Sequence, residues 1–405
     1  MSDDRRTDWL VSVDDHVLEP AGLWQDRVAA KFRDRAPRIV HEDGGEFWRY
    51  EDKRIATLGL AAVAGRSREQ FSPDPITYDD MRPGCYDPVA RIGDMDQAGI
   101  LASLCFPSLP RFCGQLFYES TDRELGFACL QAWNDWMVED WCGAAPGRLI
   151  PLMLVPLWDP ALAATEVRRC AGKGARALAF SENPVPLGLP SIHDADRYWD
   201  PLWAAVEEAE LIVCMHQGSS STRMRTSPDT PELATMAWAI GSQSSGTLLD
   251  WLFGPVFLRF PGIKIALSEG GIGWMPYFVE RAEQVLDKQR FWAAQGDRRI
   301  DHITQTFKEG TKTEVDFLTL DVRQVFHDHV FGCFIEDRCG LNNLALIGED
   351  NVMIETDYPH SDSTWPNSIA FAKKQLDGLS EEVQYKILRG NAERLFRFVA
   401  AEPPF

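Results

Sequence analysis

The stretch Leu211-Ile-Val-Cys-Met-His216-Gln-Gly218 is a short apolar run that ends in a single imidazole just before a glycine. A second stretch of the same design lies further along the chain, Ile263-Lys-Ile-Ala-Leu-Ser-Glu269-Gly-Gly271. Runs of this length and composition are typical of strands buried in a parallel sheet. In α/β barrels, the functional side chains lie at the carboxyl ends of such strands. The two stretches therefore predict a parallel sheet with chemistry at one end.

Similar apolar runs alternate with longer amphipathic segments along the whole chain, which is the pattern of parallel strands joined by crossover helices. We predict eight strands, at Trp9–His16, Ile100–Phe106, Leu149–Pro156, Ala175–Phe180, Leu211–His216, Ile263–Ser268, Val330–Phe334 and Val352–Asp357. The helices predicted around them include Asp87–Ala98, Asp122–Cys142, Asp159–Cys170, Tyr198–Ala209, Pro276–Trp292 and Ser380–Val399. This alternation favours one α/β domain over residues 1–405, a (β/α)8 TIM barrel.

Two connections are longer than a barrel needs. About seventy residues separate the first strand from the helix at Asp87–Ala98. Within them, Phe47–Tyr50 and Pro75–Tyr78 indicate a small irregular or β insertion, at about 35–87, which we expect to lie over the barrel mouth. The helical excursion Gly218–Pro255 follows the fifth strand and turns from polar to apolar. It is either a buried helix pair or subunit contact, or an apolar lid over a substrate.

Composition excludes several classes of protein. The chain of 405 residues is 45% hydrophobic and contains 14 Trp, which is enough apolar area for a buried core and argues against disorder. Its formal net charge of −20, with Arg and Lys scattered among acids, argues against nucleic acid or a membrane surface as a partner. The nine Cys form no C-x-x-C pair, and no apolar stretch suits a signal or a membrane span, so we expect a reduced cytoplasmic protein.

Four predicted strands end in side chains that can bind a metal ion. Asp14 and His16 lie two positions apart at the end of the first strand, so they share a face. His216 ends the fifth strand, Glu269 the sixth and Asp357 the eighth. Taken singly, each has a structural alternative, such as a turn, a hydrogen-bonded core histidine or a helix cap. Because the carboxyl ends of barrel strands meet at one face, the whole set favours a divalent metal site.

Five motifs spread over most of the chain carry a family resemblance. They are Asp14-Asp-His16-Val-Leu-Glu-Pro20, Arg91-Ile-Gly-Asp-Met-Asp-Gln-Ala-Gly99, Met215-His-Gln-Gly218, Glu269-Gly-Gly-Ile-Gly-Trp274 and Thr356-Asp-Tyr-Pro-His360. In this order they resemble the amidohydrolase superfamily, in particular the branch with aminocarboxymuconate-semialdehyde decarboxylase and γ-resorcylate decarboxylase. The resemblance implies that Asp14, His16, His216 and Asp357 bind the metal and that Asp357 also carries a proton.

The chain departs from the family pattern at Glu269, where many relatives have a histidine. A carboxylate there makes the site richer in oxygen, which suits Fe, Mn or a second ion better than a lone zinc. We therefore expect Glu269 to be a ligand and the cofactor to be one or two divalent ions of Fe, Mn or Zn. The fourth strand, Ala175–Phe180, lacks the lysine that binuclear relatives carbamylate.

Two other residues, His360 and Glu19, are candidates for an additional ligand or for hydrogen-bond partners of the ligands. Three further histidines could play the same part, although isolated histidines are more often structural: His193, His327 and His329. Outside the metal site, we expect a homodimer with Trp238–Phe257 as a contact.

The leading functional prediction is a metal-dependent hydrolase with Asp357, His216 and Glu269 as catalytic residues. Metal-activated water, deprotonated with help from Asp357, would attack an acyl carbon. The apolar excursion favours a bulky apolar acyl substrate, as a thioester, ester or amide, and the thioester option comes from a resemblance to iron-containing thioesterases of the superfamily. The alternatives are metal-dependent non-oxidative decarboxylation of an aromatic or unsaturated acid and a non-catalytic binding protein.

Overall fold

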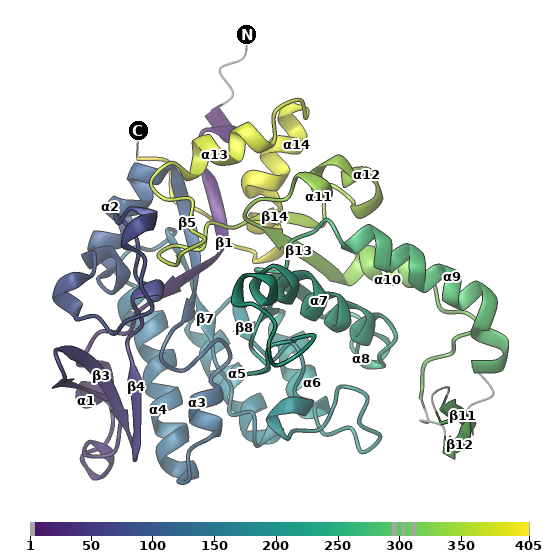
Figure 1. Cartoon of the computed structure of the whole chain (residues 1–405), viewed down its shortest axis with the longest axis horizontal. Coiled ribbons are helices and arrows are strands. Elements are labelled where there is room, and N and C mark those ends of the chain that lie inside the picture. Colours follow the sequence, from purple (N-terminus) through teal and green to yellow (C-terminus); the bar gives the residue numbers. More distant parts are fainter. Residues whose placement is uncertain (1–4, 294–297, 302–303, 310–312, 405) are drawn as a thin grey trace.

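The apolar runs of the sequence form a barrel of parallel strands, which helices surround (Figure 1). The computed structural model describes residues 5–293, 298–301, 304–309 and 313–404. The barrel strands are β1 (Leu10–Val17), β5 (Ile100–Pro107), β6 (Leu149–Ile150), β7 (Leu152–Met153), β8 (Ala177–Ala179), β9 (Ile212–His216), β10 (Lys264–Ser268), β13 (Val330–Phe334) and β14 (Val352–Ile354).

Two parallel sheets join to close this barrel. Their strand orders are β1-β5-β6 and β14-β13-β10-β9-β8-β7. Only Pro151 separates β6 from β7, and proline has no N–H for the ladder, so the two are halves of one interrupted strand. At the other junction, the Asp357 amide donates to the Asp14 carbonyl at 3.0 Å and the His16 amide to the Tyr358 carbonyl at 2.6 Å. The predicted eight-stranded TIM barrel is confirmed.

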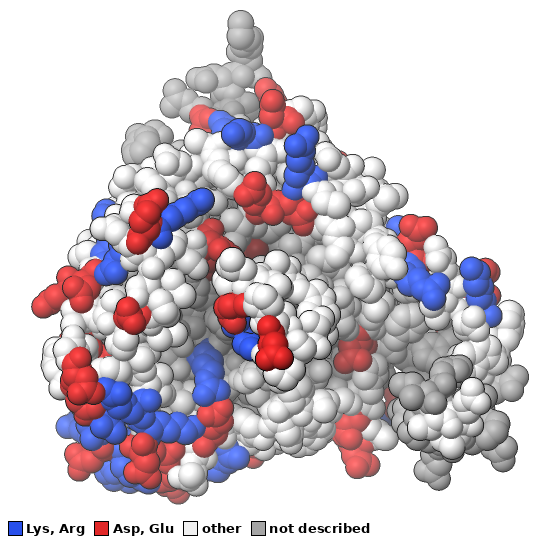
Figure 2. Space-filling view, viewed as in Figure 1, with Lys and Arg blue, Asp and Glu red and all other residues white. Residues whose placement is uncertain are grey.

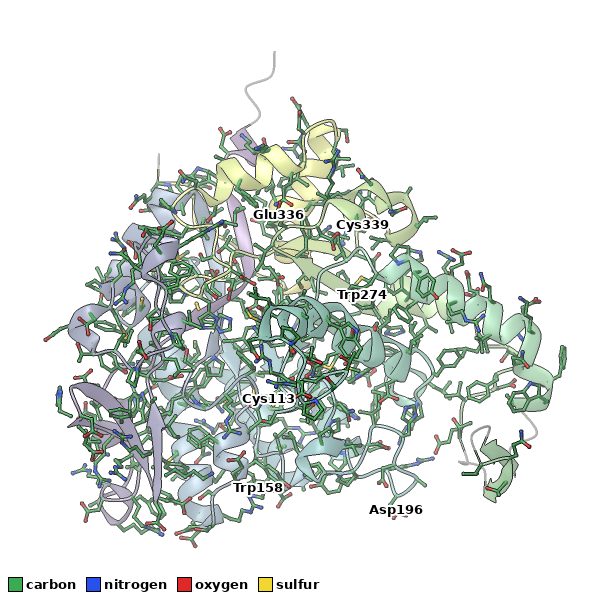
Figure 3. All side chains as sticks on the ribbon, viewed as in Figure 1. Cys113, Trp158, Asp196, Trp274, Glu336 and Cys339 are labelled. Carbon is green, nitrogen blue, oxygen red and sulfur yellow. The ribbon has the colours of Figure 1, made fainter. Side chains whose placement is uncertain are left out.

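Helices pack around the strands, and side chains fill the layer between them (Figure 3). The α-helices are α1 (Leu23–Arg27), α2 (Pro88–Ala98), α3 (Gln115–Tyr118), α4 (Arg123–Trp136), α5 (Pro160–Lys173), α6 (Asp200–Ala209), α7 (Glu232–Leu252), α8 (Val256–Arg259), α9 (Met275–Ala293), α10 (Val322–His329), α11 (Arg338–Asn342), α12 (Leu344–Ile347), α13 (Ser368–Gln375), α14 (Glu381–Tyr385) and α15 (Asn391–Leu395). Asp87, Asp122 and Asp159 cap α2, α4 and α5 by accepting from first-turn amides.

Shorter helical turns connect these elements. The 3-10 turns are η1 (Arg5–Thr7), η2 (Ala30–Phe32), η3 (Gly59–Ala61), η4 (Arg68–Gln70), η5 (Tyr78–Asp80), η6 (Pro83–Cys85) and η8 (Val185–Leu187). Two π-helical turns, η7 (Met137–Trp141) and η9 (Lys386–Gly390), continue or join α-helices. The helix predicted over Ser380–Val399 is therefore present as one continuous helical segment from Glu381 to Leu395, in which η9 joins α14 to α15.

The insertion after β1 begins with a separate sheet beside the barrel. Its antiparallel strands are β2 (Arg38–Glu42), β3 (Gly45–Tyr50) and β4 (Lys53–Ala56). Trp48 of this sheet packs edge-on against Trp24 of α1, with ring centroids 5.3 Å apart. Only the later part of the insertion, with Leu60, Arg66 and Phe71 among its residues, lines a pocket at the barrel mouth. The insertion therefore reaches the mouth through its second part alone.

The excursion after β9 forms the single long helix α7, not a helix pair. Trp251 and Phe257 are only 1% and 5% exposed, because they pack inside the protein. The expected subunit contact at Trp238–Phe257 is therefore wrong for these two residues. Trp238, in the first half of α7, is 39% exposed, and a homodimer contact there stays a prediction.

A short antiparallel hairpin has no counterpart among the elements predicted from the sequence. α9 runs outward to a hairpin of β11 (Arg298–Asp301) and β12 (Thr306–Glu309) (Figure 1). Its strands are too short to stand out as an alternating pattern in a single sequence. Within the part of the chain that the structure describes, no helix combines the length and apolar character needed to span a membrane.

We expect Gly99→Ala to destabilise the protein by roughly 1–3 kcal/mol, because Gly99 ends α2 with a φ of +74° and a Cβ there would lie 2.4 Å from Ile369 Cγ2. Gly93→Ala in the same helix is the matched control. No atom lies within 4 Å of its added Cβ, so it should stabilise by up to about 1 kcal/mol. Urea unfolding measures both changes. Equal effects of the two substitutions would show that α2 is not packed against α13 in this way.

Candidate metal centre

Five residues singled out from the sequence lie at the carboxyl ends of barrel strands. β1 carries Asp14 and His16, and β9 ends at His216. Glu269 directly follows β10, and Asp357 lies just beyond β14. Because these strands are parallel, their carboxyl ends meet at one face of the barrel. The structure thus brings together residues that are far apart in the chain.

The side chains form a tight group around His216. Its Nε2 lies 3.5 Å from Asp14 Oδ2 and 3.3 Å from His16 Nε2. Asp357 Oδ1 lies 3.2 Å from His16 Nε2, and Glu269 Oε2 lies 3.3 Å from His216 Nε2. Carboxylate oxygens and imidazole nitrogens at such spacing are a donor set that can hold a divalent cation.

The imidazole rings are fixed in orientation. Nδ1 of His216 lies 2.6 Å from the backbone oxygen of Gln217. A carbonyl can only accept, so Nδ1 carries the proton and Nε2 presents its lone pair to the group. Phe112 stacks on His216 with ring centroids 3.9 Å apart, and His360 stacks on His16 at 3.7 Å. Both rings therefore have their planes defined by aromatic neighbours.

Three carboxylate oxygens of the group accept no hydrogen bond from any described residue: both oxygens of Asp14 and Oδ1 of Asp357. The two residues are only 1% and 2% exposed. An ionised carboxylate buried without compensation costs several kcal/mol. A bound cation would supply the missing positive charge, so the residues fit a divalent metal ion.

Burial dominates the electrostatics of the group. It raises the pKa of Asp14 and of Glu269 well above their ordinary values, and neighbouring carboxylates raise both further. Burial lowers the pKa of His16 well below its ordinary value and that of His216 to about 4. Both imidazoles are therefore neutral at physiological pH, which is the form that binds metal.

Asp357 differs from the other carboxylates of the group. Burial by itself raises its pKa, but the imidazoles of His360 and His16 outweigh this effect and leave the pKa below its ordinary value. His360 Nδ1 lies 3.2 Å from Asp357 Oδ1, and the His360 side chain is 21% exposed. An imidazole thus links this buried carboxylate to the solvent.

Backbone strain accompanies the two acidic residues at the strand ends. Glu269 and Asp357 have φ angles of 53° and 52°, a region that residues other than glycine rarely adopt. The Glu269 amide donates to Glu355 Oε2 at 3.1 Å. The Asp357 amide is held by the Asp14 carbonyl across the closing junction of the barrel. Local hydrogen bonds therefore hold both turns.

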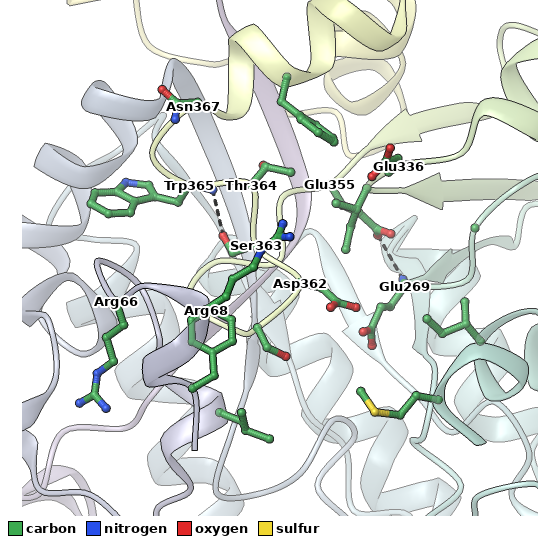
Figure 4. Close-up of a pocket in the computed structure, with 18 residues that line it drawn as sticks. Arg66, Arg68, Glu269, Glu336, Glu355, Asp362, Ser363, Thr364, Trp365 and Asn367 are labelled. Atoms are coloured by element: carbon green, nitrogen blue, oxygen red, sulfur yellow. Dashed lines mark hydrogen bonds between the residues drawn. The ribbon is translucent and has the colours of Figure 1, made fainter. Parts of the chain in front are cut away.

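A pocket of about 910 Å³ opens beside the group (Figure 4). Glu269, Glu355 and Asp362 make one side of it acidic, whereas Arg66 and Arg68 of the insertion lie on the opposite side. Figure 2 shows a hollow next to α7 with acidic side chains at its edge. Of the candidate ligands, Glu269 lines this pocket, so the pocket adjoins the candidate metal centre.

Among the buried acids that were not predicted from the sequence, three lie near the candidate ligands, namely Asp15, Glu182 and Glu355. Asp15 Oδ1 accepts from the Tyr358 amide at 2.9 Å and so ties β1 to the segment after β14. Glu355 lies two residues before Asp357, and the alternation of side chains along a strand could have placed it on the same face. Glu182, in the irregular segment after β8, gave no such signal.

Glu19 lies outside the group, although the sequence made it a candidate ligand. Its Oε1 accepts from the Ser108 amide at 3.1 Å and from Trp133 Nε1 at 2.9 Å. Its Oε2 accepts from the Leu109 amide at 2.9 Å. With both oxygens occupied, Glu19 instead fixes the loop that carries Phe112.

Three other candidate histidines also lie outside the group. His193 Nε2 lies 2.7 Å from Asp250 Oδ1. His329 stacks on Phe257 with ring centroids 4.2 Å apart. His327 lies on α10 and contributes to no potential ligand set among the described residues. Only His360, of the additional candidates, approaches the centre.

Fold and site together define a TIM-barrel enzyme with a candidate centre for a divalent metal ion. The model of the Amidohydrolase family matches residues 45–398, and the chain therefore belongs to this family, as its motifs predicted. Over 291 residues it is 27% identical to a γ-resorcylate decarboxylase from Rhodococcus jostii (strain RHA1), which covers 68% of this chain and 78% of the relative.

Solved structures support the same fold. An amidohydrolase from Mycobacterium avium subsp. paratuberculosis has a TM-score of 0.67 at 23% identity, with 96% of this chain and 97% of the other covered. A 5-carboxyvanillate decarboxylase from Sphingomonas paucimobilis has a TM-score of 0.63 at 18% identity, with coverages of 96% and 99%. A dihydroxybenzoic acid decarboxylase from Polaromonas sp. JS666, with bound manganese and the inhibitor 2-nitroresorcinol, has a TM-score of 0.57 at 17% identity, with coverages of 98% and 99%.

These relatives overturn the leading functional prediction. We predicted hydrolysis of an acyl bond, but the related enzymes are named as decarboxylases of aromatic acids, and the hydrolase prediction with its thioester option is wrong. The error came from interpreting Gly218–Pro255 as a surface for a bulky apolar acyl group. Much of its second half is instead buried against the barrel, and the pocket wall carries charged side chains, including Glu269, Glu336 and Arg66, beside its apolar ones.

We expect Glu19 to make stability depend on pH. Burial raises its pKa to about 7 from 4.5, so the folded chain binds the proton more tightly between these pH values and stability falls as pH rises through this window. Glu19→Gln removes the titration. The unfolding free energy of the wild type relative to this variant should fall by roughly 2–3 kcal/mol between pH 5 and 8. A difference that stays constant with pH would contradict the assignment.

Proposed function

We propose that this chain is a metal-dependent, non-oxidative decarboxylase of hydroxylated aromatic carboxylic acids. The observation that carries the proposal is the buried group of Asp14, His16, His216 and Asp357, with its uncompensated carboxylate oxygens, next to the pocket that Glu269 lines. The similarity to a γ-resorcylate decarboxylase gives the reaction class. Decarboxylation was the alternative that the sequence analysis left open.

Asp14, His16, His216 and Asp357 would hold the metal ion, and Glu269 would be a fifth ligand. Manganese is the first candidate, since a set with more carboxylates than imidazoles suits it. A structural relative from Polaromonas also contains manganese. Bound there, a divalent cation would act as a Lewis acid that orients the substrate carboxylate and the adjacent hydroxyl group.

The reaction breaks the bond between a ring carbon and the carboxyl carbon, releases CO2 and places a proton on the ring carbon. We assign the delivery of this proton to Asp357 Oδ1. His360 Nδ1 lies 3.2 Å from that oxygen and can return a proton to it from the solvent side. The chain would thus supply the proton from one side of the group and bind the carboxylate on the other.

The pocket supports a small polar aromatic substrate. Its volume of about 910 Å³ accommodates a ring with several substituents. Phe371 and Trp365 provide apolar surface for the ring, whereas Ser363 and Thr364 offer hydroxyl groups for its polar substituents. Arg66 and Arg68 favour an anion at the mouth and can attract a carboxylate to the site.

We expect the protein to bind about one Mn²⁺ and to release CO2 from a panel of hydroxybenzoates, with one deuterium incorporated at the vacated ring carbon in D2O. Chelation should abolish turnover, and Mn²⁺ should restore it. Asp14→Asn should lower kcat/KM at least about a hundredfold, because it removes an anionic ligand. Metal analysis, CO2 detection and NMR of the product measure these outcomes. A protein that binds no divalent metal and turns over no acid of the panel would refute the proposal.

We expect Glu269→Gln to weaken Mn²⁺ binding by roughly ten- to a hundredfold, because Glu269 Oε2 lies beside His216 Nε2. Glu336→Gln is the matched control. It removes the same charge from the pocket wall, but among the described residues Glu336 forms no ion pair with a candidate ligand, whereas Glu269 Oε2 lies 3.3 Å from His216 Nε2. Calorimetric titration with Mn²⁺ compares the two variants. Equal affinities would mean that Glu269 acts through its charge and not as a ligand.

A further inference from the structure

Glu182 is a buried carboxylate for which the proposed reaction has no use. It follows β8, one of the strands that contribute no residue to the metal-binding group, and it is 5% exposed. Its Oε1 accepts from the Gly218 amide at 3.0 Å, from Ser220 Oγ at 2.8 Å and from Gln243 Nε2 at 3.1 Å. Glu182 therefore joins the turn after His216 to the helix α7.

Gln243 of α7 has an amide group whose orientation is determined by its neighbours. Nε2 donates to Glu182 Oε1 and, at 3.0 Å, to the Thr222 carbonyl. Both are acceptors, so the amide oxygen must face the other way. There, Gln243 Oε1 accepts from Gln217 Nε2 at 3.2 Å.

Gln217 completes a connection from α7 to the metal-binding group. Its side chain binds Gln243, and its backbone oxygen accepts the Nδ1 proton of His216. Displacement of the Gln217 side chain would move the carbonyl that sets the orientation of the His216 ring. The path from Gln243 to His216 thus consists of two hydrogen bonds joined through the covalent frame of Gln217.

The same face of α7 lines the substrate pocket. Met236 and Ile240 contact the pocket, and they precede Gln243 by seven and three residues, a spacing that places all three on one side of a helix. Thr247, one turn further, donates to the Glu182 carbonyl at 3.1 Å. One stripe of α7 therefore contacts both the pocket and the support of His216.

We propose that Gln243 is a positioning residue for metal binding: through Gln217 it holds His216 in its ligating orientation and couples that ligand to the pocket wall of α7. The inference rests on the proposed function in that it takes His216 as a metal ligand. Glu182 is the fixed point of the arrangement. Thr247 keeps α7 attached to the Glu182 backbone when the Gln243 amide is removed. The positioning of His216 by Gln243 can therefore be tested separately from the packing of α7.

The test uses the full-length protein loaded with Mn²⁺. Gln243→Met preserves volume but removes the amide, and we expect it to weaken Mn²⁺ binding about tenfold and to change the EPR spectrum of bound Mn²⁺. Gly246→Ala is the matched control on α7, since no atom lies within 4 Å of its added Cβ, and it should leave both readouts unchanged.

A double-mutant cycle with Gln217→Met separates positioning from packing. Gln217→Met removes the other partner of the bond between Gln217 Nε2 and Gln243 Oε1, so if Gln243 acts through Gln217, the double variant should lose no more Mn²⁺ affinity than the weaker-binding single variant, to within about threefold. Losses that multiply would mean that the two residues act independently.

Two outcomes distinguish the possible failures. If the wild type binds Mn²⁺ and Gln243→Met retains both its affinity and its EPR spectrum, the positioning role is refuted while the proposed function stands. If Gln243→Met weakens binding but its effect multiplies with that of Gln217→Met, the hydrogen-bond path is refuted as the cause. A wild type that binds no Mn²⁺ would refute the proposed function itself, and with it this inference.

Discussion

The confinement of several carboxylates in a small buried volume is the constraint on which the centre of this molecule depends. Asp14, Glu269 and Asp357 converge there, and among the residues that the structure describes no lysine or arginine pairs with them. Water is largely excluded, so the repulsion between the charges is weakly screened. Neutral imidazoles cannot balance these charges. The centre is stable only with protons or with a cation, and that requirement links the architecture to its chemistry.

The scaffold around the centre holds the ligand-bearing strands in place through buried polar contacts. Asp15 binds the segment after β14 from β1. The buried guanidinium of Arg91 donates to the His16 carbonyl at 2.5 Å and to the Gly84 carbonyl at 2.6 Å, so it fixes the end of β1 from outside. Glu182 holds the turn after β9 in place by accepting from the Gly218 amide. Each strand end thus has an anchor that does not belong to the metal-binding group.

Much of the fold and of the centre could be predicted because both depend on local pattern. In the apolar runs that end in Asp14, His216 or Asp357, the strand and the candidate ligand at its end can be recognised in one stretch of sequence. Contacts between distant residues could not be predicted in this way. The Glu19 carboxylate looks the same in sequence whether it binds a metal or the amides of Ser108 and Leu109. The reaction was also beyond the sequence pattern, since the same ligands serve hydrolysis and decarboxylation.

The positive φ of Glu269 has a consequence for the evolution of the family. Among residues other than glycine, histidine is one of those that tolerate this left-handed conformation better than most. The backbone at position 269 is therefore already in a conformation that suits histidine, the residue that the family resemblance leads us to expect there. One substitution can exchange an oxygen donor for a nitrogen donor without rebuilding the turn, so preference between metals can drift in this lineage while the barrel stays unchanged.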